Sequence, residues 1–286
     1  MAQFTNFATL SYNGLTLTSN TVTGELLETV SISKTSTSET YGTEDDLTYI
    51  VNLVNSGSNQ VCGLRVTDDL GAYEFGGETV YPLRYREGSL RFFVDGVLQS
   101  TPKVCSLEPL VISDVCIPAC GNATLVYDTE TTPYAPLDAD STITNTACVT
   151  GGCLAAPVCA SETLCAAEGP ELQISKALAP AAVSVGGTLT YTFLIENCGN
   201  TPVTAADSVT LSDTFDPVLC ALSVSYNGAP WSAPVNYSYD QASGVFTTVP
   251  GAITVPAATY SQGPNGAWSV TPGTATLSIT GTVKGA

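Results

Sequence analysis

Several short segments of this sequence occur twice, each time separated by the same number of residues, so the fold must accommodate two similar modules. The intervals 174 − 32, 189 − 47 and 197 − 55 all equal 142. The matching segments are Ser31-Ile32-Ser33-Lys34 with Gln173-Ile174-Ser175-Lys176, Leu47-Thr48-Tyr49 with Leu189-Thr190-Tyr191, and Asn55-Ser56-Gly57 with Asn197-Cys198-Gly199. Further along, Val66-Thr67-Asp68 matches Leu211-Ser212-Asp213, and Ala123-Thr124-Leu125 matches Ala275-Thr276-Leu277. Self-similarity at this spacing indicates tandem copies of one structural unit.

Both copies have the residue pattern of β-strands. Short runs rich in Val, Ile, Thr, Tyr and Phe are separated by turn residues such as Asn227-Gly228 and Pro272-Gly273. Apolar and polar residues alternate over residues 47–54 and 189–195, and helical periodicity is absent. We therefore predict an all-β chain of two tandem immunoglobulin-like Greek-key β-sandwiches. A jelly roll is the alternative.

The two modules differ at their ends. Module 1, residues 25–168, continues after its last matching strand into a further hairpin near residues 143–149 and 160–165. Module 2, residues 169–286, has no sequence corresponding to that hairpin. We therefore expect module 2 to lack its last two strands.

A matching hairpin sequence lies in residues 1–24, which we call the arm. Thr5-Asn6-Phe7-Ala8 matches Thr144-Asn145-Thr146-Ala147, and the turn Asn13-Gly14 matches Gly151-Gly152. An ordinary N-terminal extension with a chance match is the other interpretation.

A sandwich without its last hairpin exposes apolar core and an unpaired strand edge. Insertion of the arm into module 2 of a neighbouring chain would cover both, by donor-strand complementation. Such a contact is heterologous and builds a head-to-tail homopolymer. The predicted docking residues are Phe4, Asn6, Phe7, Ala8, Leu10, Tyr12 and Val22. The alternatives are a monomeric adhesin or ligand-binding module whose arm folds back on its own chain, and a sheet-forming surface-layer protein.

Strand parity directs three polar side chains onto otherwise apolar faces. In module 1 they are Lys34, Asp68 and Asn145; in module 2 they are Lys176 and Asp213, with Asn6 supplied by an arm. A buried charge must be paired, so we expect each set to meet. One outcome is a Lys–Asp ion pair hydrogen-bonded to Asn. Another is a self-forming Lys–Asn isopeptide bond, because a desolvated lysine is a better nucleophile and a carboxyl group can shuttle protons. The third is a lysine that reaches solvent.

Charge and composition exclude several function classes. The chain carries 26 acidic and 8 basic side chains, a net charge of −18, which argues against nucleic acid or an anionic membrane as partner. It contains no histidine, which excludes Ser-His-Asp hydrolases and His-ligated zinc. No facing carboxylate pair indicates a glycosidase. We predict a protein that is not an enzyme and that takes no cofactor.

Ten cysteines predict disulfides within or between subunits. They are Cys62, Cys105, Cys116, Cys120, Cys148, Cys153, Cys159, Cys165, Cys198 and Cys220. Their spacing lacks the paired CxxC pattern of zinc sites, so no metal is predicted. The acidic clusters Glu44-Asp45-Asp46 and Asp138-Ala139-Asp140 suit calcium, although short acidic turns are more often solvated. Tyr226, Trp231, Tyr237 and Tyr239 suit a glycan site, but we expect cross-strand packing.

No segment of about 20 apolar residues predicts membrane insertion. Residues 1–24 contain no Lys or Arg, so we expect no conventional signal peptide. Disulfides nevertheless indicate an oxidising compartment. We therefore expect an extracellular, cell-surface or spore-surface location reached without such a signal.

The phrases Ile-Ser-Lys, Leu-Thr-Tyr, Val-Thr-Asp and Thr-Asn-Thr-Ala resemble the bacterial "conserved repeat domain" family of surface proteins. The opening Phe4-Thr5-Asn6-Phe7-Ala8 resembles a group of such proteins in Firmicutes that start without a signal peptide. Among clostridia, similar proteins occur in the appendages of endospores. The resemblance implies Ig-like sandwiches in surface fibres, assembled with copies of the same chain and with other appendage or surface proteins. The many cysteines depart from the family pattern, in which Thr or Val is expected at several of these positions.

Overall fold

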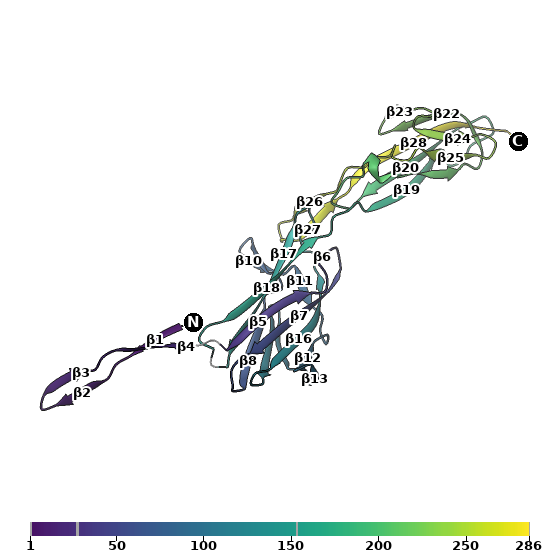
Figure 1. The fold of residues 1–286 in the computed structure, drawn as a ribbon. Coiled ribbons are helices and arrows are strands. Elements are labelled where there is room, and N and C mark those ends of the chain that lie inside the picture. The colour runs from purple at the N-terminus through teal and green to yellow at the C-terminus, as the bar shows by residue number, and fades with distance from the viewer. Residues whose placement is uncertain (1, 27–28, 153, 286) are drawn as a thin grey trace. The chain divides into compact units, whose positions relative to one another are not determined.

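The computed structural model describes residues 2–26, 29–152 and 154–285 (Figure 1). These residues form β-strands and a single short 3-10 helix, η1 (Ala205–Asp207), so the predicted all-β fold is confirmed. None of the described segments forms a helix with the length and apolarity needed to cross a bilayer. The chain forms two compact units. Unit 1 comprises Met1–Pro136 with Thr142–Cys165, and unit 2 comprises Leu137–Ser141 with Ala166–Ala286.

Unit 1 is a sandwich of two antiparallel sheets. The first has the order β13-β12-β16-β7-β5, with β11 also paired to β16. Its strands are β5 (Val30–Ser36), β7 (Asp46–Asn55), β11 (Leu83–Tyr85), β12 (Arg91–Val94), β13 (Val97–Gln99) and β16 (Asn122–Thr131). The second sheet has the order β14-β15-β8-β17-β18-β6. Its strands are β6 (Thr40–Tyr41), β8 (Val61–Asp68), β14 (Lys103–Leu107), β15 (Leu110–Ile117), β17 (Thr142–Gly151) and β18 (Val158–Ala166).

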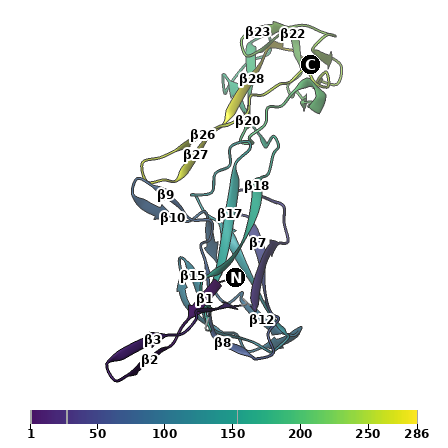
Figure 2. The same cartoon turned by 60° about the vertical axis from the view of Figure 1, so that its left-hand side comes forward.

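The pairing in unit 1 follows the immunoglobulin arrangement, in which the two strands that close the domain lie side by side in the second sheet. Here β17 and β18 are that closing pair (Figure 2). A separate small hairpin is formed by β9 (Tyr73–Phe75) and β10 (Glu78–Val80). The core exists because alternate residues point inward: β7 buries Leu47, Tyr49, Val51 and Leu53, and exposes the residues between them more.

Unit 2 also has a large sheet, of order β19-β20-β28-β22-β23. Its strands are β19 (Leu172–Ala179), β20 (Thr188–Asn197), β22 (Leu219–Tyr226), β23 (Ala229–Trp231) and β28 (Gly273–Val283). A smaller sheet contains β21 (Ser212–Thr214), β25 (Val245–Thr248) and β24 (Tyr237–Asp240), and a hairpin joins β26 (Thr259–Gln262) to β27 (Trp268–Thr271). Tyr226 stacks on Trp231 and Tyr237 on Phe246, so these aromatic side chains pack across strands.

The arm folds as a long hairpin. Its strands are β1 (Ala2–Asn6), β2 (Thr9–Tyr12), β3 (Leu15–Thr18) and β4 (Val22–Leu26), so the last strand runs two residues past the predicted boundary. Asn13 and Gly14 have φ of 46° and 79°, as a two-residue type I′ turn requires. The pairing shifts by one residue between Asn6–Val22 and Thr9–Thr18.

Candidate functional site

The two units differ at one strand edge. In unit 1, β8 pairs with β15 on one side and with β17 on the other, so that Asp68 lies opposite both Leu110 and Ala147. In unit 2 the equivalent strand is β21, where Asp213 lies opposite Phe246 of β25. Among the described residues, no strand pairs with the other edge of β21. Unit 2 therefore presents an open edge where unit 1 has its closing hairpin.

The strand facing that open edge is also uncovered. In unit 1, β5 buries Val30 and Lys34, whereas all eight residues of its counterpart β19 are exposed. Ile174 is 60% exposed. An open groove of about 310 Å³ follows this edge, and its apolar lining comprises Leu172, Ile174, Ile195, Val209, Leu211 and Ile253. Burying one such side chain stabilises a fold by about 1.5–3 kcal/mol, so this surface favours a covering strand.

The arm has an apolar face, like the groove of unit 2. Leu10 lies opposite Leu17, and Tyr12 lies opposite Leu15, and all four side chains are more than half exposed. The residues that alternate with these four along β2 and β3, and so lie on the opposite face, are Thr9, Ser11, Thr16 and Thr18. Leu15 and Leu17 are absent from the predicted docking set, although the Asn13-Gly14 turn signal would have paired them with Tyr12 and Leu10.

The remaining predicted docking residues lie nearer the base of the arm. The ring of Phe4 lies against Gly24, the residue opposite it in β4. Asn6 is paired with Val22, whose side chain is 55% exposed. Phe7 and Ala8 lie between β1 and β2, where the Ala8 amide donates to Ser19 Oγ at 2.8 Å.

The closing hairpin of unit 1 shows how such a hairpin packs. β17 buries Asn145, Ala147 and Val149 on one face. On the other face, hydroxyl pairs join the two strands, Thr144 with Thr163 and Thr146 with Ser161, each at 2.9 Å. The arm has a similar hydroxyl pair, Ser11 with Thr16 at 3.1 Å.

Unit 1 contains a buried polar centre built on Lys34. The Lys34 ammonium donates to Asp68 Oδ2, and the side chains of both residues are at most 2% exposed. Asp68 also accepts from the Tyr127 hydroxyl and, through Oδ1, from the Leu70 amide at 3.0 Å. Lys34 Nζ lies 4.8 Å from the centre of the Tyr49 ring. Tyr127 and Tyr49 were not among the predicted site residues, although both lie at inward-facing positions of their strands.

Asn145 completes this centre. It is fully buried, and neither polar atom of its amide makes a hydrogen bond of normal geometry within the described structure. Burial raises the pKa of the neighbouring Tyr49 hydroxyl, and Asn145 opposes that rise. A buried amide without partners costs about 1–3 kcal/mol, so Asn145 is uncompensated, as is the Tyr49 hydroxyl beside it.

The protonation of Lys34 reflects two opposed effects. Burial lowers its pKa, because the charged ammonium loses water, while the Asp68 carboxylate raises it. Burial prevails, and the net pKa lies below the usual lysine value. A neutral amine, the nucleophilic form of lysine, is therefore more accessible here than at the surface.

The equivalent centre in unit 2 is incomplete. Lys176 again contacts its aspartate, Asp213, and lies 4.5 Å from the centre of the Tyr191 ring. However, its side chain is 41% exposed, because no strand of the described residues covers it. By the repeat alignment, Ile279 occupies the position of Tyr127, and no asparagine of unit 2 occupies that of Asn145.

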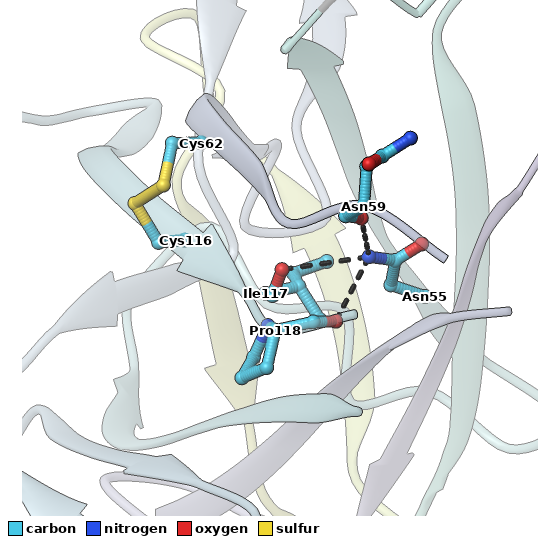
Figure 3. Close-up of a disulfide and its surroundings, with 6 residues drawn as sticks. All are labelled: Asn55, Asn59, Cys62, Cys116, Ile117 and Pro118. Atoms are coloured by element: carbon cyan, nitrogen blue, oxygen red, sulfur yellow. Dashed lines mark hydrogen bonds between the residues drawn. A yellow bond between two sulfur atoms is a disulfide. The ribbon is translucent and has the colours of Figure 1, made fainter. Parts of the chain in front are cut away.

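The described cysteines of unit 1 form two disulfides, and both join neighbouring strands. Cys62–Cys116 joins β8 to β15, close to where Asn55 Nδ2 donates to the carbonyls of Asn59 and Pro118 (Figure 3). Cys148–Cys159 joins β17 to β18, the closing hairpin. In a chain-entropy model such crosslinks add about 4 and about 3 kcal/mol respectively.

The other described cysteines, Cys105, Cys120, Cys165, Cys198 and Cys220, are free thiols. Cys153 lies outside the described residues. No group of three or more His, Cys, Asp or Glu side chains in the described chain is arranged to hold a metal ion. In the acidic segment 44–46, Asp45 accepts from the Gly42 amide and Asp46 pairs with Arg86.

No family model and no curated protein matches this sequence. Solved structures with partial similarity include the pilus backbone RrgB of Streptococcus pneumoniae, with 11% identity over 85% of this chain and a TM-score of 0.33. The match spans 49% of RrgB, about half its length. BcpA, the major pilin of Bacillus cereus, has 12% identity over 96% of this chain and 74% of its own, with a TM-score of 0.36. Red sea bream transglutaminase has 15% identity over 79% of this chain and 27% of its own, with a TM-score of 0.28.

Proposed function

We propose that this protein is a structural subunit of a filament, assembled when the arm of one chain enters unit 2 of the next. The observation that carries the proposal is the contrast between the units: β8 has a closing hairpin beside it, and β21 has an open edge beside an uncovered apolar groove. An exposed edge of this kind is a template for strand addition. The disulfides favour an oxidising location, so the fibre belongs outside the cell or on a cell or spore surface.

The closing hairpin of unit 1 supplies the register for the docked arm. Because Ala147 lies opposite Asp68 and Val149 opposite Val66, the matching Ala8 and Leu10 would lie opposite Asp213 and Leu211. Leu10 would then enter the groove. Asn6 would then take the position in unit 2 that Asn145 takes in unit 1, on the strand beside Asp213.

Deleting residues 1–24 should abolish polymerisation, because the donor strands are removed while both units keep their cores. Negative-stain electron microscopy of the full-length and arm-deleted proteins checks this. An excess of free arm peptide should shorten full-length filaments by occupying the acceptor. Filaments of equal length from the arm-deleted protein would contradict the proposal, and monomers from both proteins would favour an arm folded back in a monomeric adhesin.

We further propose that Lys34 and Asn145 join covalently, and that Lys176 and Asn6 do so after docking. The neutral Lys amine attacks Cγ of the Asn side chain, a new C–N amide bond forms, and the bond from Cγ to Nδ2 breaks. The proton lost by the amine passes through the Asp carboxyl group to the departing nitrogen, which leaves as ammonia. The uncompensated Asn145 amide and the lowered pKa of Lys34 support this step.

Intact-mass spectrometry of the reduced, denatured monomer should show the loss of one ammonia. The loss should disappear in Asn145→Ala, while Asn55→Ala, which replaces a buried asparagine with satisfied hydrogen bonds, should keep it. A monomer with the full sequence mass would mean that Lys34 and Asp68 remain a simple ion pair.

A further inference from the structure

The proposed assembly brings particular ends of two units together. In unit 1 the closing hairpin opens beyond the end of β8: the Asp69 amide, directly after β8, donates to the Thr146 carbonyl at 3.0 Å, and β17 begins four residues earlier, at Thr142. The same register, with Ala8 opposite Asp213, directs the open end of a docked arm beyond Thr214, the last residue of β21. The first residues of the next subunit's sandwich therefore begin at this end of unit 2.

Unit 2 carries a free thiol close to that point. After β21 the chain turns and re-enters the large sheet at Leu219, the first residue of β22. Cys220 follows directly, with Thr282 opposite it in β28. Its sulfur lies 3.4 Å from the Thr282 carbonyl, and the residue is partly exposed. Cys220 therefore follows Thr214, the last residue of β21, by six residues in the chain. A docked arm would emerge from unit 2 beside this end of β21.

Unit 1 carries a free thiol at the end that the arm leads into. The Cys120 amide donates to the Gly57 carbonyl at 2.9 Å, and the adjoining Ser56 amide donates to the Thr29 carbonyl at 2.7 Å. Thr29 directly precedes β5, the first strand of the sandwich. Cys120 is exposed and forms no disulfide.

The covalent connection between arm and sandwich is short. From Leu26, the end of β4, to Val30, the start of β5, the chain takes four residue steps. Four steps span at most about 14 Å even when fully extended. In the proposed filament, the end of unit 2 that carries Cys220 therefore faces the end of the next unit 1 that carries Cys120.

We propose that Cys220 of one subunit and Cys120 of the next form a disulfide across this joint. The inference rests on the proposed donor-strand assembly and adds the residues that lock it. Two thiols are oxidised and a small-molecule disulfide is reduced: with oxidised glutathione, one protein disulfide forms and two glutathione thiols are released. This bond ties the two units in addition to the docked arm, so subunits that lack the Lys176–Asn6 bond separate only when a reductant is present.

The test uses filaments of the full-length protein formed with oxidised glutathione. They are alkylated, digested without reductant and searched by mass spectrometry for a linked peptide containing Cys120 and Cys220. Cys120→Ser and Cys220→Ser should each remove this peptide and the reductant-sensitive part of the covalent multimers. Cys105→Ser, which replaces another exposed free thiol of unit 1, should remove neither. The arm-deleted protein should not form the linked peptide.

The outcomes separate this inference from the assembly on which it rests. Filaments visible by electron microscopy but lacking the linked peptide would overturn the disulfide and leave donor-strand assembly standing. The linked peptide at equal yield in the arm-deleted protein would also overturn it, since the pairing would then not depend on docking. Absence of filaments from the full-length protein would overturn both proposals together.

Discussion

Leu10→Asp is expected to prevent filament formation by the otherwise intact protein. In the proposed register Leu10 fills the groove of unit 2, so the substitution loses about 1.5–3 kcal/mol of apolar burial. It also places an unpaired carboxylate in an apolar site, which costs several kcal/mol more. Since about 1.4 kcal/mol corresponds to a tenfold change in affinity, assembly should require at least a hundredfold higher protein concentration.

The matched control for this prediction is Ser11→Asp. Ser11 adjoins Leu10 in β2 and forms part of the arm's hydroxyl-bearing face. The same charge introduced there should stay in solvent and change the assembly concentration little. Light scattering against protein concentration measures both variants. Equal assembly by the two would show that this face of the arm does not enter an apolar groove.

The groove of unit 2 can be tested by an equivalent substitution. Ile174 is 60% exposed in the free subunit, so Ile174→Asp should fold normally and still fail to accept an arm. Mixing Ile174→Asp with Leu10→Asp tests whether the subunits assemble head to tail. Each variant lacks a different half of the joint, so an equimolar mixture should form dimers and stop, because one functional arm and one functional groove remain.

Asp68→Ala is expected to destabilise unit 1 by about 3–5 kcal/mol, the usual consequence of leaving a buried charge without its partner. Lys34 and the Tyr127 hydroxyl both lose their acceptor. The equivalent change in unit 2, Asp213→Ala, should cost less than about 1 kcal/mol in the arm-deleted monomer, because Lys176 is 41% exposed and water replaces the lost partner.

The two units can be followed separately in this experiment. Both tryptophans of the chain, Trp231 and Trp268, lie in unit 2, so their fluorescence reports on that unit, whereas circular dichroism reports on both. In urea, Asp68→Ala should shift the dichroism transition and leave the tryptophan transition in place. A loss below 1 kcal/mol would show that Lys34 is not held by Asp68 in the folded state. Intact mass, measured on the same samples, shows whether the Lys34–Asn145 bond has also been lost.

Local features of the sequence were sufficient for several elements. The alternation in β7 and the two-residue turn Asn13-Gly14 each depend on neighbouring residues alone, and both are present in the structure as expected. Strand parity placed Lys34 and Asp68 on inward faces, and desolvation of a charge then requires a partner nearby. Such inferences succeed because the two-residue period of a strand is a property of the backbone itself.

Other features needed the pairing of distant strands. The partners of Cys62 and Cys148 depend on which strands are adjacent and in which register, and the sequence positions of cysteines do not specify this. The role of Tyr127 also came from the fold, since its hydroxyl reaches Asp68 from the facing sheet.

The two lysines differ in a way that the sequence alone does not determine. By itself, the sequence determined that Lys34 and Lys176 are equivalent positions on equivalent strands, because the repeat and the period of the strand are local and countable. Only the tertiary structure decided that one is buried and the other is 41% exposed. Burial depends on what packs over a side chain, and for Lys34 that is a hairpin more than a hundred residues away in the chain, whereas for Lys176 the described part of its own chain supplies none.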